Sequence, residues 1–323
     1  MVRNRCIATA ALALALVTVA AACGGNDDDG AGVRDCSTAS GSASGSASAS
    51  GSASGSTGCS GSGSGIADQV KGSSTDDAQV KAAVAAYGTW AKGQVDDTIA
   101  KTTAFTDAVR AGDVAAAKAT YAPSRQGWER IEPAASLVPE IDGAVDSRVD
   151  DFKGVDDPKF TGWHRLEYLL WSKNTTEGAK PFADQLDKDL QTLKTKLAGL
   201  EIPPAALAVG SSELIEEVSS GKITGEEDRY SHTDLWDFAA NVEGSEKGFD
   251  LLEPALKAKD AKLAGEIEAL FTKLDGQLAT YKDGAGYQPY SALTEADKAQ
   301  MKTTLADLSE KLSDVAGTLG LGG

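Results

Sequence analysis

Apolar residues recur every three or four positions through much of the chain after residue 75, and this spacing constrains the fold more than any other feature. One such stripe ends before Gly199 and consists of Leu186, Leu190, Leu193 and Leu197. The spacing places these side chains on one face of an α-helix, a face that is buried against other elements in a folded protein. No stretch shows the sustained alternation of apolar and polar residues that is typical of a half-buried strand. The sequence therefore predicts an all-α protein.

Helix caps and helix breakers divide residues 76–323 into several helices. The segment Thr75 to Asp77 predicts the start of the first helix, because its side chains can accept hydrogen bonds from free N–H groups. Gly112-Asp113 predicts a break before a second helix that continues through Trp128. Two more stripes consist of Leu263, Ile267, Leu270, Leu274 and Leu278, and of Leu305, Leu308, Leu312 and Val315. At this length, these helices favour two packed helical bundles.

Residues 1–22 have the pattern of a short export signal. Arg3 and Arg5 precede an uncharged apolar run that is shorter than the roughly 20 residues of a membrane-spanning helix. Small residues then lead directly to Cys23, as in a bacterial lipobox, where the Cys is acylated and anchors the protein to the outer face of the cytoplasmic membrane. The alternative is an ordinary cleaved signal, because Ala20 stands where Leu is more usual. Both interpretations predict an exported protein of the cell envelope, periplasmic or on the cell surface.

Residues 23–75 predict a disordered tether that follows the acylated Cys23. The segment is rich in Ser, Gly and Ala, and it has too few large apolar residues to offset the entropy lost on folding. Cys36 and Cys59 lie within it and could form a disulfide after export. The remaining residues, 76–323, contain no cysteine, which excludes iron–sulfur, cysteine–zinc and thiol chemistry there.

The charge of the chain favours cations as ligands. Its 323 residues include 31 Lys and Arg against 48 Asp and Glu, which gives a formal charge of −17. This balance argues against nucleic acid and anionic membrane surfaces as direct partners, and it can raise the local concentration of cations.

One of the two histidines lies in a pattern that can bind a metal ion. His164 and Glu167 are three residues apart, so on a helix they share a face and can both reach one ion. A pattern this short also occurs by chance. The alternative is a buried imidazole that is hydrogen-bonded to Glu167.

Further carboxylates are grouped along the chain. Glu129 and Glu132 have the same helical spacing, and Asp146 follows within a few turns. Glu227 belongs to an acidic run that extends to Asp234, in which Ser231 or Thr233 is the candidate helix cap. Two carboxylates 4 Å apart repel by roughly 4 kcal/mol at an effective dielectric constant of 20, so a convergent set needs a proton, a basic side chain or a metal ion. Salt-bridge networks or solvated acidic faces are the alternatives, because the chain offers Arg125, Arg130, Arg148, Arg165 and Arg229 nearby.

Several longer stretches resemble the EfeO/EfeM iron-uptake lipoproteins of the imelysin-like family. The most specific is Gly225-Glu-Glu-Asp-Arg-Tyr-Ser-His-Thr-Asp-Leu-Trp-Asp-Phe238, which continues to Asn241-Val-Glu-Gly244. Shorter ones are Tyr121-Ala-Pro-Ser-Arg125, Glu129-Arg-Ile-Glu-Pro133, Asp157-Pro-Lys-Phe-Thr-Gly162 and His164-Arg-Leu-Glu167. The resemblance extends from about residue 78 to the C-terminus.

The resemblance implies an all-α, imelysin-like fold of two packed four-helix bundles with a metal site between them. It implies an iron-binding component of an uptake system, not an enzyme, that delivers iron to a membrane permease and works beside a haem-type peroxidase. The metal ligands that it implies are Glu129, Glu132, Asp146, His164, Glu167 and Glu227. Oxygen and imidazole donors suit ferric or ferrous iron, and zinc or manganese could bind the same set.

Copper binding, peptidase activity and polysaccharide binding are less favoured functions. Longer members of the family carry an N-terminal cupredoxin domain, and the tether stands in its place here, so copper is not expected. A metallopeptidase of the imelysin-like class would use His164, but Tyr168 stands where the inverse zinc motif has its second His. A polysaccharide-binding surface lipoprotein is disfavoured by the negative charge, unless metal ions bridge it to an acidic polymer.

Overall fold

The computed structural model describes residues 67 and 69–321. The expected export signal, the acylated Cys23 and the cysteines Cys36 and Cys59 lie outside these residues. The elements, in chain order, are α2 (Ala78–Arg110), α3 (Val114–Glu129), α4 (Glu132–Ala135), α5 (Pro139–Val145), η1 (Val149–Asp151), α6 (Gly162–Glu167), η2 (Tyr168–Ser172), α7 (Lys180–Ala198), α8 (Pro204–Ser220), η3 (Lys222–Thr224), α9 (Asp234–Lys259), α10 (Ala261–Ala279), β1 (Lys282–Asp283), β2 (Gly286–Tyr287), η4 (Tyr290–Ala292) and α11 (Glu295–Leu319).

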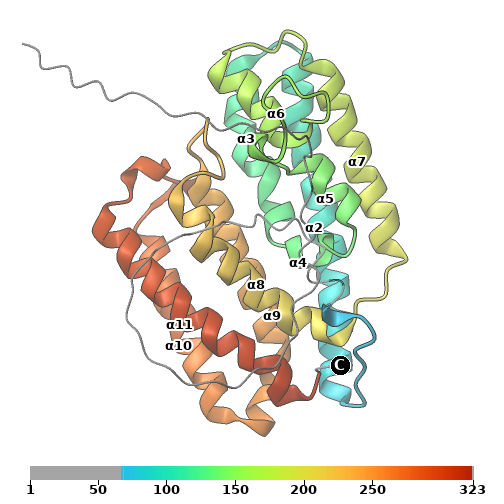
Figure 1. Ribbon diagram of the computed structural model, residues 1–323, viewed down its shortest axis with the longest axis vertical. Coiled ribbons are helices and arrows are strands. Elements are labelled where there is room, and N and C mark those ends of the chain that lie inside the picture. The colour runs from blue at the N-terminus through green and yellow to red at the C-terminus, as the bar shows by residue number, and fades with distance from the viewer. Residues whose placement is uncertain (1–66, 68, 322–323) are drawn as a thin grey trace, which may run out of the picture. The chain divides into compact units, whose positions relative to one another are not determined.

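The helices form two packed bundles, which confirms the expected all-α architecture (Figure 1). Helix α8 packs against α9 and α11 in one bundle, and α10 packs against α9 and α11. In the other bundle α2 packs against α3 and α7, and the short helices α5 and α6 lie against α7. Short helices thus complete this bundle beside α2, α3 and α7. Helix α9 also contacts α2 and α3, so it joins the two bundles.

The predicted caps and stripes account for most of the long helices. The Asp77 side chain accepts from two N–H groups at the start of α2, and Asp113 caps α3 after the break at Gly112. The four leucines of the α7 stripe are buried, as are the apolar faces of α10 and α11, although Leu270 is only partly covered. Within the described residues, no helix has the length and apolar character needed to cross a lipid bilayer.

The packed part of the chain begins before residue 76, where the sequence placed the end of the tether. Val70 is 1% exposed and belongs to the hydrophobic core. The Ser73 hydroxyl accepts from the backbone N–H of Ala205 at the start of α8, at 3.1 Å. One buried apolar side chain and one hydrogen bond hold this segment against the helices. Amino-acid composition does not predict either contact.

Helix α9 approaches the end of α3 closely because Gly244 has no side chain. A Cβ atom at this position would lie 2.2 Å from the carbonyl oxygen of Arg130. The approach lets the Asn241 amide, one turn earlier, donate to the backbone oxygen of Glu129 at 2.8 Å. The contact therefore fixes α9 against the segment that carries Glu129 and Glu132.

We expect Gly244→Ala to destabilise the protein by about 1–3 kcal/mol in urea unfolding, because the added methyl group forces α9 away from Arg130. The matched control is Gly265→Ala in α10, where a Cβ atom meets nothing within 4 Å. That substitution is expected to stabilise the protein by up to about 1 kcal/mol, since alanine is the better helix former. Equal effects of the two substitutions would contradict the close approach.

Candidate metal centre

The candidate centre lies where the short helices α5 and α6 of the α2–α3–α7 bundle meet the segment that precedes α9. Asp146 follows the last residue of α5, His164 lies in the first turn of α6, and Glu227 lies between η3 and α9. Gly162 brings the first two together. It has a φ of +74°, and a Cβ atom there would lie 2.0 Å from the carbonyl oxygen of Val145. Only glycine allows α6 to begin against the end of α5 in this way.

Asp146, His164 and Glu227 converge on one position. The Nε2 atom of His164 lies 3.6 Å from Asp146 Oδ1 and 3.6 Å from Glu227 Oε1. The imidazole is 2% exposed, and its Nε2 atom has no hydrogen-bond partner in the structure. A buried polar atom without a partner costs free energy, so this nitrogen favours a ligand between itself and the two carboxylates. One ligand atom from each of the three residues lies within 4.8 Å of the others, close enough for all three to hold one ion.

Glu167 orients the imidazole from its other side. Its Oε2 atom lies 3.1 Å from His164 Nδ1, and its Oε1 atom accepts from the backbone N–H groups of Tyr230 and Ser231 at 2.9 and 2.7 Å. A carboxylate that accepts the Nδ1 hydrogen directs Nε2 toward Asp146 and Glu227, which is the usual arrangement at a metal-binding histidine. The Tyr121 hydroxyl, 3.5 Å from Nδ1, donates to the adjacent Asp228.

Arg125 of α3 lies at the centre of the cluster and is fully buried. Its Nη1 contacts Asp146 Oδ1, and its Nη2 lies 2.5 Å from Glu129 Oε1 and 3.2 Å from Glu227 Oε1. Its Nε faces two further carboxylates, those of Asp228 at 3.7 Å and Asp237 at 3.4 Å. One guanidinium therefore partly neutralises five carboxylates that come from several different elements.

Lys222 forms the second positive centre, beside Glu129 and Glu132. The Lys222 side chain is 1% exposed. Its Nζ atom lies 2.5 Å from Glu129 Oε2 and 3.0 Å from Glu132 Oε2. The Asn241 amide also donates to Glu132 Oε2, at 2.6 Å. Glu129 and Glu132, which the sequence predicts as metal ligands, lie in the same cluster. Their oxygens contact Lys222, Arg125 and Asn241, and the groups that could hold an ion around His164 do not include them.

The charges of the cluster keep the two carboxylates next to His164 Nε2 ionised. Burial alone would raise the pKa of Asp146 and Glu227, but both are lowered. The Arg125 guanidinium lowers the pKa of Asp146, and the Lys222 ammonium lowers that of Glu227 well below its usual range. Burial and Arg125 act to lower the pKa of His164, but its hydrogen bond with Glu167 and the nearby Glu227 carboxylate raise it to about 10.

Comparison with known proteins identifies the family. The sequence model of the family Peptidase_M75, described as Imelysin, matches residues 83–319. This chain belongs to the imelysin family. It is 46% identical over 260 residues to the iron uptake system component EfeO of Escherichia coli O157:H7, a match that covers 78% of this chain and 69% of the relative. The EfeO proteins of Escherichia coli K12 and Shigella flexneri are each 45% identical, with the same coverage.

A solved structure shares the fold of this chain. The crystal structure of an iron-regulated protein A precursor from Parabacteroides distasonis superimposes with a TM-score of 0.60. The match covers 77% of this chain and 97% of that one, at 18% sequence identity. At this identity the likeness shows the fold alone.

The sequence of this imelysin member left several residues of the centre unassigned. The sequence indicates Arg125 only as a candidate salt-bridge partner. It gives no sign that Lys222, in a short segment with Ser and Gly neighbours, is buried among carboxylates. Asp228 and Asp237 lay in the stretch that resembles the family, but nothing in their spacing predicts that they face Arg125. Thr233 stands at the first position before α9, as expected, but its hydroxyl donates to Asp228 and does not cap the helix.

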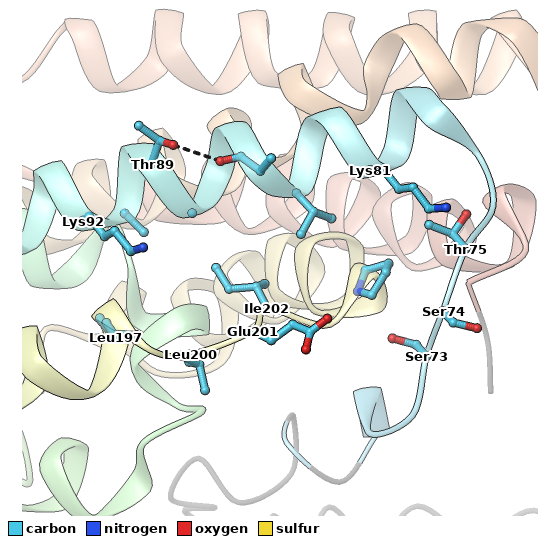
Figure 2. A pocket seen from close by; sticks show the side chains of 15 residues that line it. Ser73, Ser74, Thr75, Lys81, Thr89, Lys92, Leu197, Leu200, Glu201 and Ile202 are labelled. Atoms are coloured by element: carbon cyan, nitrogen blue, oxygen red, sulfur yellow. Dashed lines mark hydrogen bonds between the residues drawn. The ribbon is translucent and has the colours of Figure 1, made fainter.

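A groove of about 440 Å³ lies elsewhere in the described part of the imelysin fold, between the start of α2 and the α7–α8 connection (Figure 2). Lys81 and Lys92 border it on α2, and Leu200, Glu201 and Ile202 border it on the connection. Its lining includes none of the carboxylates around Arg125. The groove is therefore separate from the candidate metal centre.

We expect Lys222→Met to destabilise the protein by about 3–5 kcal/mol, because it leaves the buried Glu129 and Glu132 without their counter-charge. The matched control is Lys257→Met, which removes the exposed ion pairs of Lys257 with Glu253 and with Glu268 of α10. Urea unfolding of this control should give the wild-type midpoint. A Lys222→Met protein as stable as the wild type would show that the ammonium does not hold these carboxylates together.

Proposed function

We propose that this protein is an extracytoplasmic iron-binding component of an iron uptake system, and that Asp146, His164 and Glu227 are the iron ligands. The named relatives are iron uptake components, which supports the process. The observation that carries the assignment of the site is His164 Nε2, a buried nitrogen without a hydrogen-bond partner that faces two ionised carboxylates.

The donor set favours iron as the cargo. Two carboxylates and one imidazole are ligands that Fe(II) and Fe(III) accept, although manganese and zinc accept them as well. Glu129, Glu132 and Glu167 support the site from around it, through Arg125, Lys222 and the imidazole. The ionised carboxylates of Asp146 and Glu227 supply the negative charge that attracts a cation.

Binding and delivery fit the centre better than catalysis. The groups of His, Asp and Glu that could hold an ion in the described residues contain His164 and do not include the second histidine, His232. A zinc peptidase of the usual kind needs two histidine ligands and a separate catalytic Glu. We therefore assign to this member a carrier role despite the family name.

The location and the partners follow from the carrier role. We infer that residues 1–22 direct export, that Cys23 carries the lipid anchor, and that the Ser/Gly/Ala-rich segment tethers the helical domain to the membrane. A tether of this length lets the domain reach a membrane permease that receives the iron. A haem-type peroxidase of the same system is the further partner that this assignment includes.

Replacing a ligand should remove iron binding without unfolding the protein. We expect His164→Gln and Glu227→Gln to weaken iron binding by roughly 100-fold or more, and Glu167→Gln by about 10- to 100-fold, because Glu167 only orients the imidazole. Fluorescence can follow the titration, since Trp128 Nε1 donates to Asp146 Oδ2 at 2.8 Å. The control is Glu226→Gln, an exposed neighbour of Glu227 paired with Arg229. Wild-type iron affinity in His164→Gln would reject the site.

Iron binding should strengthen as the pH rises. The pKa of His164 is raised to about 10, so between pH 7 and pH 9 the imidazole holds a proton that the ion must displace. Metal and proton compete for the same nitrogen, and the association constant should therefore rise about tenfold per pH unit in this interval. Zinc, which does not change oxidation state, is the suitable probe for competition titrations. An affinity independent of pH would contradict a protonated His164 at the site.

A further inference from the structure

Arg125 contacts the same oxygen atoms that the proposed iron site uses. Its Nη1 contacts Asp146 Oδ1, and its Nη2 lies 3.2 Å from Glu227 Oε1. Each of these two oxygens also lies 3.6 Å from His164 Nε2. An ion between the imidazole and the two carboxylates would therefore share both oxygens with a guanidinium that cannot lose its charge.

The arginine has other partners that do not face His164 Nε2. Its Nη2 pairs with Glu129 at 2.5 Å, and its Nε lies 3.4 Å from Asp237 Oδ2. The guanidinium carbon also lies 5.6 Å from the centre of the Trp163 ring, within the range of a cation–π contact. Arg125 can therefore give up Asp146 and Glu227 and remain held by Glu129, Asp237 and Trp163.

The charge of Arg125 acts on a bound ion according to the valence of that ion. Coulomb repulsion is proportional to the product of the two charges, so it is greater for a trivalent ion than for a divalent one at the same position. Water does not screen this repulsion well, because the guanidinium is fully buried. An unpaired arginine would exclude cations altogether, but here the surrounding carboxylates outnumber it.

We propose that Arg125 is a built-in competitor for the iron ligands, and that it weakens the binding of trivalent ions more than that of divalent ions. The arginine thereby keeps captured ferric iron exchangeable, as handover to a second protein requires. This inference rests on the proposed function, because it assigns a further residue to the same site. It gives Arg125 a role in affinity beyond its structural role in joining five carboxylates.

The test compares the affinities of Ga³⁺ and Mn²⁺ in three proteins. Ga³⁺ is a trivalent ion that stays in one oxidation state, and Mn²⁺ is the divalent probe. We expect Arg125→Met, which removes the charge, to bind Ga³⁺ at least tenfold more tightly than the wild type, and to gain less for Mn²⁺. Arg125→Lys keeps the charge and should keep the wild-type ratio of the two affinities. A purely structural role would change both affinities of Arg125→Met by the same factor, and that result overturns the proposal.

A second measurement uses the wild-type protein, in case Arg125→Met does not fold. A crystal structure with Mn²⁺ bound should show Nη1 of Arg125 separated from Asp146 Oδ1 while Nε remains beside Asp237. An arginine that keeps its contact with Asp146 Oδ1 beside the bound ion would contradict the competition. Wild-type protein that binds neither Ga³⁺ nor Mn²⁺ refutes the iron site itself. Binding by the wild type without a valence-dependent gain in Arg125→Met refutes only the role of Arg125.

Discussion

The buried guanidinium of Arg125 is the interaction on which the centre of this protein depends. It contacts carboxylates from its own helix, from the end of α5 and from the segment around the start of α9. Burying so many charges is costly unless each has a partner of opposite sign. Arg125 and Lys222 supply those partners, and the apolar packing of the two bundles excludes the water that would weaken the pairs. The cluster therefore joins the elements on which the ligands lie.

The same interaction explains how a buried cluster of carboxylates can be stable and still attract a cation. Full neutralisation of the carboxylates would leave nothing to attract an ion, and no neutralisation would drive them apart. The structure lies between these limits. Asp146 and Glu227 have lowered pKa values and remain ionised, because Arg125 and Lys222 are near, while His164 Nε2 lies 3.6 Å from each of them without a hydrogen bond. Glu167 holds the imidazole in the orientation that keeps this nitrogen directed at the carboxylates.

Most of the fold was predictable from local patterns, and part of the centre was not. The stripes on α7, α10 and α11 and the caps at Asp77 and Asp113 depend on residues a few positions apart, so the sequence reveals them directly. The predicted grouping of Asp146, His164 and Glu227 came from a resemblance to known proteins and not from their spacing. The roles of Arg125 and Lys222 depend largely on contacts with distant residues, such as Asp237 at 112 positions from Arg125 and Glu129 at 93 positions from Lys222, and no period or motif encodes such contacts.

Anomalous diffraction at the iron absorption edge, from crystals soaked with iron, tests the central claim most directly. The account predicts one strong peak between His164 Nε2, Asp146 and Glu227, with metal–ligand distances near 2.0–2.2 Å, in the range found for such donors. A peak on the Nδ1 side of His164, a peak at Glu129 and Glu132 with Lys222 displaced, or iron bound only at surface carboxylates would contradict it.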